Sequence, residues 1–204
     1  MTDTLWIIFG SVGVIVAVAI AAVLRGRALS GGDRSAGPRP AVDEPVRWER
    51  KRQKAVDDLR ILDTPAEDRF DRIVTMARQL YSTESAVFAV TDRDRDWHKS
   101  RSGNTRESAP RSSSFCSVTI RGAGSLVIGD ASKDGRFNTL PGVVGNPNVR
   151  FYAGFPVRSP NGQQIGALCV YDPTPRDAAE VDDSMLEQLA HLLEAELRVA
   201  PVPR

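Results

Sequence analysis

The chain has 204 residues, of which 41% are hydrophobic and 26% charged, and its formal net charge is +1. These values are typical of an ordinary globular protein, and the near-neutral balance argues against a nucleic-acid-binding surface over the whole molecule. We therefore expect no nucleic-acid partner. Two cysteines, Cys116 and Cys169, are too few for a secreted fold held together by disulfides.

The segment 5–24 carries no charged residue and is mostly apolar. As a helix it would be about 30 Å long, which matches the hydrocarbon core of a bilayer. A cleavable signal peptide would need a basic region first, but Asp3 is the only charged residue among 1–4. The sequence therefore predicts one transmembrane helix over 5–24.

Basic residues follow this segment and none precedes it; they are Arg25, Arg27, Arg34 and Arg39. The positive-inside rule then places the N-terminus outside the cell membrane and the rest of this single-pass chain in the cytoplasm. Residues 25–45 are rich in Gly, Pro, Arg and Ser, and this composition predicts a flexible basic linker.

A helix is predicted from Val46, because its residues repeat at alternating intervals of four and three positions. The repeat consists of four apolar residues and one arginine: Trp48, Arg52, Ala55, Leu59 and Leu62. This is a short seam of heptad type, which Arg52 weakens, and two heptads alone do not make a stable coiled coil. A second helix is predicted with Thr64 as N-cap and Pro65 at its first position. Its buried stripe would consist of Phe70, Ile73, Val74, Ala77 and Leu80.

Five strands are predicted from runs of apolar and β-branched residues: 86–91, 96–102, 126–128, 151–157 and 165–171. The last two flank Ser159–Gly162, a hairpin turn. Consecutive apolar residues within the strands indicate a sheet covered on both faces. A closing helix over 177–198 completes an α+β fold, an antiparallel sheet with helices packed on it.

The segment 129–150 has little regular patterning and many polar residues. Long loops in compact domains are often lids or binding loops, so we predict that it closes over a small ligand. The alternative is a surface loop that packs Phe137 into the core.

Motifs for metal or catalytic chemistry are weak. Asp92, Asp94 and Asp96 imitate the start of a calcium loop, but Trp97 and Gly103 occupy its sixth and twelfth positions. The His and Cys residues lack the spacing of zinc ligands, and no phosphate-binding loop or nucleophile elbow is present. We expect no metal, no cofactor and no catalytic residue.

Cys116 is the one plausible reactive group. If His98, Lys99, Arg101 and Arg111 lay near it, they would favour its thiolate, as in a redox sensor or a thiol-dependent reductase. A buried, unreactive cysteine is the commoner case.

Several segments, in their order and spacing, resemble the bacterial GAF domain, in the group that stands alone or precedes histidine kinases and diguanylate cyclases. They are RILDTPAEDRFDRIVTMARQLY, DRDWHKSRSG, SSSFCSVTI, VIGDASKDGRF and VRFYAGFPVRSPNGQQIGALCVYD, followed by the closing helix. The resemblance covers about residues 60–197.

The resemblance implies helices on one face of the sheet, a small-molecule pocket under loops on the other, and dimerisation through the first and last helices. The implied pocket residues are Trp97, Phe115, Cys116, Asp130, Phe137, Phe151, Tyr152 and Cys169, with Lys99 and Arg150 reaching an anionic or polar group. Ser117 follows Cys116 where bilin-binding relatives have histidine, so light sensing is not expected.

These observations predict a GAF-like sensory domain over 46–200, held at the membrane. It would bind a small molecule or partner and signal to a separate downstream protein, because no output domain follows in this sequence. One alternative is a membrane-tethered dimeric scaffold with an empty pocket. The other is a thiol-based redox sensor or reductase that uses Cys116.

Overall fold

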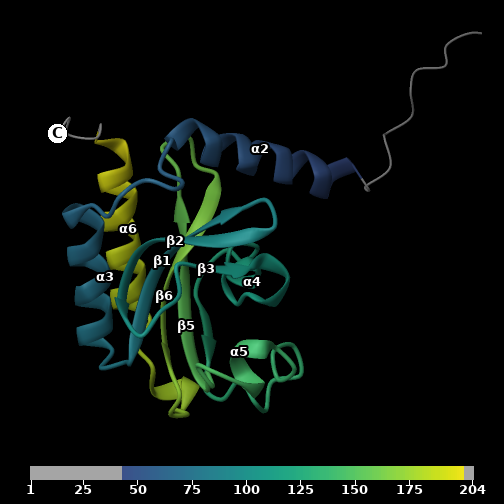
Figure 1. The fold of residues 1–204 in the computed structure, drawn as a ribbon, viewed down its shortest axis with the longest axis vertical. Coiled ribbons are helices and arrows are strands. Elements are labelled where there is room, and N and C mark those ends of the chain that lie inside the picture. The colour runs from purple at the N-terminus through teal and green to yellow at the C-terminus, as the bar shows by residue number, and fades with distance from the viewer. Residues whose placement is uncertain (1–42, 200–204) are drawn as a thin grey trace, which may run out of the picture. The chain divides into compact units, whose positions relative to one another are not determined.

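The computed structural model describes residues 43–199 of the chain (Figure 1). The predicted transmembrane helix over 5–24 and nearly all of the predicted linker over 25–45 lie outside these residues. Within 43–199, none of the helices has the length and apolar character needed to cross a bilayer.

A six-stranded antiparallel sheet forms the centre of the domain, with strand order β3-β2-β1-β6-β5-β4. The strands are β1 (Ser85–Asp92), β2 (Arg95–Gly103), β3 (Ser108–Pro110), β4 (Leu126–Ile128), β5 (Phe151–Arg158) and β6 (Gln164–Asp172). All five predicted strands are present. β3 was not predicted, because three residues with no apolar run give no periodic signal.

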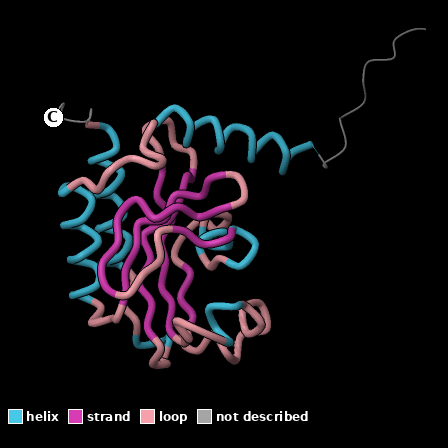
Figure 2. The backbone as a smooth tube through the Cα atoms, in the orientation of Figure 1, coloured by secondary structure: helices cyan, strands magenta, loops and turns pink. Residues whose placement is uncertain are grey.

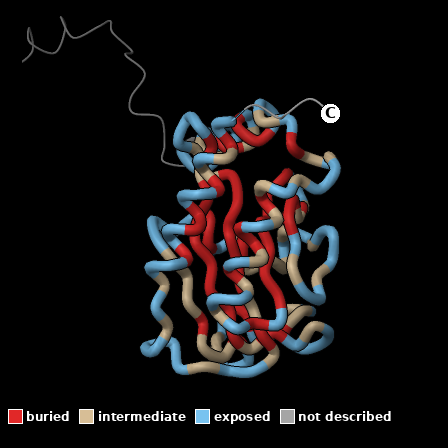
Figure 3. The backbone as a smooth tube through the Cα atoms, turned by 90° about the vertical axis from the view of Figure 1, so that its left-hand side faces the viewer, coloured by how far each residue is buried: buried red, intermediate tan, exposed pale blue. Residues whose placement is uncertain are grey.

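The central strands are buried along their length, as Figure 3 shows. In β1, Ala86, Phe88 and Val90 join one apolar cluster, whereas Val87 and Ala89 join a second one. Successive side chains of a strand point to opposite faces, so two clusters mean that both faces are covered. The predicted double coverage is confirmed.

Helices α3 (Asp68–Leu80) and α6 (Ser184–Arg198) pack on one face of the sheet (Figures 1 and 2). Phe70 from α3 lies with its ring centroid 5.6 Å from that of Phe88 in β1. The predicted stripe on α3 is buried except at Leu80, which is 52% exposed. We call this side of the sheet the helix face.

The predicted start of α3 is wrong. Thr64 does not cap the helix; its hydroxyl donates to the carbonyl of Ile61 at 2.7 Å, and α3 begins at Asp68 after Glu67. The predicted closing helix likewise begins later, at Ser184, since Asp177 caps a separate 3₁₀ turn, η2 (Ala178–Glu180). In both places side chains hydrogen-bond to nearby backbone and compete with helix formation.

Helix α2 (Asp43–Leu59) packs on the domain through the predicted seam. Arg52 is 0% exposed and Ala55 is 2% exposed within the same chain. Those two positions are therefore occupied by an intramolecular contact, and they are not free to form the predicted dimer seam. Dimerisation through the remaining surfaces of the first and last helices stays a prediction.

Candidate functional site

The face of the sheet opposite α3 and α6 is covered by two segments, which we call the cap. They are α4 (Cys116–Thr119) and residues 129–150, which include α5 (Pro141–Val144) (Figures 1 and 2). Cap residues Phe137 and Val143 are each 1% exposed and pack in the second apolar cluster with Val87 and Cys169 of the sheet. Phe137 thus enters the core, as the alternative interpretation of this segment required.

Five of the ten predicted pocket residues meet beneath the cap: Phe115, Cys116, Phe137, Tyr152 and Cys169. The ring of Phe115 stacks on both neighbouring rings, with centroids 4.7 Å from Phe137 and 4.8 Å from Tyr152. These side chains contact one another where the sequence predicted a ligand. A molecule could enter here only by displacing the stack.

The hydroxyl of Tyr152 lies at the centre of this group. It is 2.7 Å from Thr119 Oγ1 and 3.0 Å from Cys169 Sγ. Burial and the neighbouring cysteines raise the pKa of Tyr152, so the phenol stays protonated. Gly154 leaves room for the hydroxyl, since a Cβ atom there would collide with the Tyr152 oxygen.

Cys116 and Cys169 place their sulfur atoms 3.2 Å apart, and both thiols are buried. The hydrogen bond with Cys169 and burial raise the pKa of the Cys116 thiol. This shift is opposite to the one that neighbouring cations would produce, and Cys116 is buried, as in the commoner case. Cys116 is buried in the second apolar cluster, whereas Lys99 Nζ lies 5.8 Å from the ring centroid of Phe70 on the helix face.

Asp130 and Arg150 lie at the edge of the cap, with Arg150 Nε 4.0 Å from Asp130 Oδ1. Arg150 Nη1 donates to the carbonyls of Val143 and Val149 at 3.0 and 3.1 Å. Asp130 Oδ1 accepts from the Ser132 hydroxyl at 2.6 Å, which lowers the pKa of the carboxyl group. Both side chains thus stabilise the backbone conformation of the cap by hydrogen bonds within it.

Three predicted pocket residues, Trp97, Lys99 and Phe151, lie on the helix face. Trp97 is opposite Val90 in the strand register, and residues paired in this way share a face. Lys99 Nζ pairs with Glu67 at 2.7 Å and lies 5.7 Å from the Trp97 ring centroid. Phe151 packs in the helix-face cluster. The structure thus does not bring these three together with the other seven.

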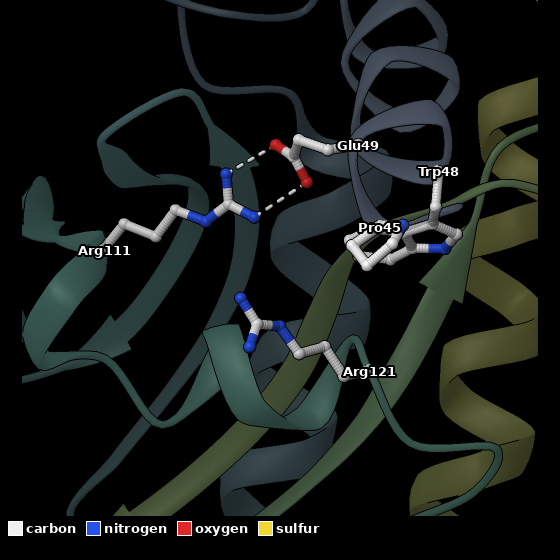
Figure 4. Close-up of a pocket in the computed structure, with 5 residues that line it drawn as sticks. All are labelled: Pro45, Trp48, Glu49, Arg111 and Arg121. Carbon is white, nitrogen blue, oxygen red and sulfur yellow. Dashed lines mark hydrogen bonds and ion pairs between the residues drawn. The ribbon is translucent and has the colours of Figure 1, made fainter. Parts of the chain in front are cut away.

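A site that sequence reasoning missed lies between α2 and the cap side of the domain. A cleft of about 590 Å³ is lined by Pro45, Trp48, Glu49, Arg111 and Arg121 (Figure 4). The first three belong to α2, Arg111 begins the 3₁₀ helix η1 (Arg111–Ser113), and Arg121 follows α4. No sequence motif joins residues so far apart, and only the docking of α2 creates the cleft.

In this cleft the carboxylate of Glu49 accepts hydrogen bonds from two arginines. It accepts from Arg52 Nε and Nη2 at 3.0 and 2.8 Å, and from Arg111 Nη1 and Nη2 at 2.6 and 3.0 Å. Burial acts to raise the pKa of Glu49, but these hydrogen bonds outweigh it and lower the pKa to about 2. Arg52 also donates to the carbonyl of Thr91 at 2.5 Å, so α2 is anchored to β1.

Comparison with known proteins identifies the family. The model of the GAF domain matches residues 65–197. A cyclic di-GMP phosphodiesterase of Pseudomonas aeruginosa is 38% identical over 150 residues, which are 73% of this chain and 26% of that protein. The chain thus spans about a quarter of the length of this relative.

Solved structures share the fold at low identity. The GAF domain of an Acinetobacter phosphoenolpyruvate-protein phosphotransferase has a TM-score of 0.51 and 17% identity, covering 74% of this chain and 92% of that one. A type II free methionine-R-sulfoxide reductase from Thermoplasma acidophilum has a TM-score of 0.51 and 15% identity, covering 62% and 88%. Since the family model matches well over half of the chain, this protein belongs to the GAF domain family, whose members are small-molecule-binding signalling modules.

Proposed function

We propose that this chain is a membrane-anchored sensory GAF module. A small molecule or a protein partner would displace the cap, and the change would pass through the terminal helices to a separate signalling protein. The observation that carries the proposal is the position of Phe115, stacked between Phe137 of the cap and Tyr152 of β5. A ligand that replaced this one ring would separate the cap from the sheet.

The apolar segment 5–24 and the arginines after it support a membrane location with the domain on the cytoplasmic side. Cell fractionation of the full chain tests this part. We expect it in the membrane fraction, resistant to extraction at high salt, and released when residues 5–24 are deleted. Recovery of the full chain in the soluble fraction would contradict the anchor.

Mass spectrometry of small molecules released from the full chain, purified in detergent and then denatured, tests sensing. We expect an enriched small molecule with the wild type, and a higher occupancy with Phe115→Ala, because the substitution removes the ring that competes for the space. Val144→Ala, at a 70% exposed position of the cap, is the matched control. No enrichment with any variant would favour the tethered dimeric scaffold instead.

The contact between Cys116 and Cys169 favours a second candidate, a thiol redox sensor. A hydroperoxide would accept two electrons and two protons from the thiols, giving a disulfide, an alcohol and water. The raised pKa of the Cys116 thiol makes this reaction slow, because the thiolate is the nucleophile.

Thiol titration and intact mass after treatment with hydrogen peroxide test the redox candidate. The expected result is the loss of both thiols and of two hydrogen atoms in mass, reversed by a reductant and absent in Cys169→Ser. Thiols that survive peroxide while the protein stays folded would exclude it. The same result would leave the sensory proposal standing, since that proposal needs no cysteine chemistry.

A further inference from the structure

The cleft beneath α2 continues into a neighbouring hollow. This second hollow has a volume of about 450 Å³ and shares Trp48 and Arg121 with the cleft. It adds residues of the turn after α4 and of the β5–β6 hairpin, namely Gly122, Ala123, Arg158, Gly162, Gln163 and Gln164. Volumes of this size suit a small organic molecule.

Of the two arginines that line the cleft, Arg111 is paired with Glu49, and Arg121 is not. Glu49 is the only acidic residue lining it, and its carboxylate is already shared by Arg52 and Arg111. Arg121 is exposed, and its guanidinium has no hydrogen-bond or ion-pair partner within residues 43–199. Figure 4 shows this guanidinium directed into the cleft, towards the Glu49–Arg111 pair. An anion there would gain a charge-assisted hydrogen bond.

The cleft is also lined by one aromatic side chain, Trp48. Trp48 is half-buried and packs against the apolar cluster beneath the cap, and Pro45 lies beside it (Figure 4). An indole held in this way offers a flat apolar surface at a fixed position. A flat ring could stack on it while an anionic group reaches Arg121, since both residues line the same cleft.

We propose that this cleft binds a small organic anion in which a phosphate or carboxylate is attached to a flat ring. Arg121 binds the anionic group, and Trp48 contacts the ring. The Arg111–Glu49 pair shows that the cleft already holds a carboxylate by two parallel hydrogen bonds. The ligand bridges α2 and the body of the domain, so its binding favours the docked position of α2.

The site is separate from the space beneath the cap, where Phe115 stacks on Phe137 and Tyr152. It needs no displacement of core side chains. It therefore goes beyond the proposed function and does not rest on it.

The test uses the full chain in nanodiscs and follows the three tryptophan indole N–H signals by NMR during titration with 1-naphthyl phosphate. Trp48 is assigned from Trp48→Phe, and Trp6 and Trp97 are internal controls. We expect the Trp48 signal to shift with a dissociation constant below about 1 mM. Inorganic phosphate lacks the ring and 1-naphthol lacks the charge, so each should bind at least about tenfold more weakly.

Arg121→Gln should raise the dissociation constant at least about tenfold. Arg72→Gln, an exposed arginine on α3 across the sheet, removes the same charge and should leave binding unchanged. The proposal is overturned if the Trp48 signal has not shifted when the probe reaches about 10 mM. It is also overturned if Arg121→Gln binds like the wild type, or if Arg72→Gln weakens binding equally. None of these outcomes affects the search for a ligand beneath the cap, which has its own readout.

Discussion

The carboxylate of Glu49 in α2 accepts two hydrogen bonds from the guanidinium of Arg111, which lies 62 residues further along the chain. This pair, together with Arg52, fastens the first described helix to the body of the domain. In the proposed membrane-anchored arrangement, α2 is the element that follows the linker. We therefore expect loss of the Glu49–Arg111 pair to loosen α2 from the body of the domain.

The stability contributed by Glu49 should depend on pH. Its pKa is lowered from 4.5 to about 2 in the folded state, so the contribution is complete above the unfolded value. It is lost as the pH falls from about 4.5 towards 2. Because the side chain is partly exposed, we expect only about 1 kcal/mol.

Urea unfolding of the wild type and Glu49→Gln at several pH values measures this effect. The free energy of unfolding of the wild type should be higher than that of Glu49→Gln at pH 7. The two free energies should become equal as the pH falls towards about 2. A difference that does not change with pH would mean that the ion pair does not stabilise the docked helix. Lys54→Gln, whose ion pair with Asp58 is exposed, is the control.

Phe137→Ala should loosen the cap. The substitution leaves a cavity in the apolar cluster and should cost about 3 kcal/mol or more. Hydrogen exchange should show faster amide exchange in 129–150, while β1 keeps its protection, because the helix-face core is unchanged. Val144→Ala in the same segment should exchange like the wild type. Equal loss of protection in β1 would show that the cap cannot open separately.

Gly154→Ala should destabilise the domain by about 1–3 kcal/mol, because the added Cβ meets the Tyr152 hydroxyl and ring. The same substitution in a Tyr152→Phe background should cost less, since part of the collision is then gone. Thermal unfolding of the four proteins in this double-mutant cycle measures the difference. Costs that simply add would show that Tyr152 does not occupy this space.

Lys99→Met should destabilise the domain without affecting any ligand beneath the cap. Lys99 is fully buried, and its ammonium group donates to Thr64 Oγ1 and the Pro65 carbonyl and pairs with Glu67. Removing it leaves Glu67 with Arg69 as its remaining partner, at a cost of about 2 kcal/mol. Chemical unfolding measures the cost. Loss of a bound molecule at unchanged stability would instead support the original expectation that Lys99 reaches a ligand.

Local patterns were sufficient to predict the α+β class, the five apolar strands and the stripe on α3, because period-two and period-3.6 burial is written directly in the sequence. The order of short segments also indicated the GAF family. The starts of α3 and α6 were wrong by several residues, since Thr64 binds the backbone before α3 and Asp177 caps the separate turn η2.

Contacts between residues distant in sequence determined where the predicted site residues lie and where the cleft forms. The register shift between Phe88 and Ala89 adds a residue to β2, and Trp97 and Lys99 then meet the helix face. Phe115 stacks on Phe137 and Tyr152 at the position of the predicted pocket. The cleft beneath α2 exists only once Glu49 meets Arg111. Sequence spacing determines which face of one element is apolar, but only the packing of several elements determines whether the space between them is filled or open.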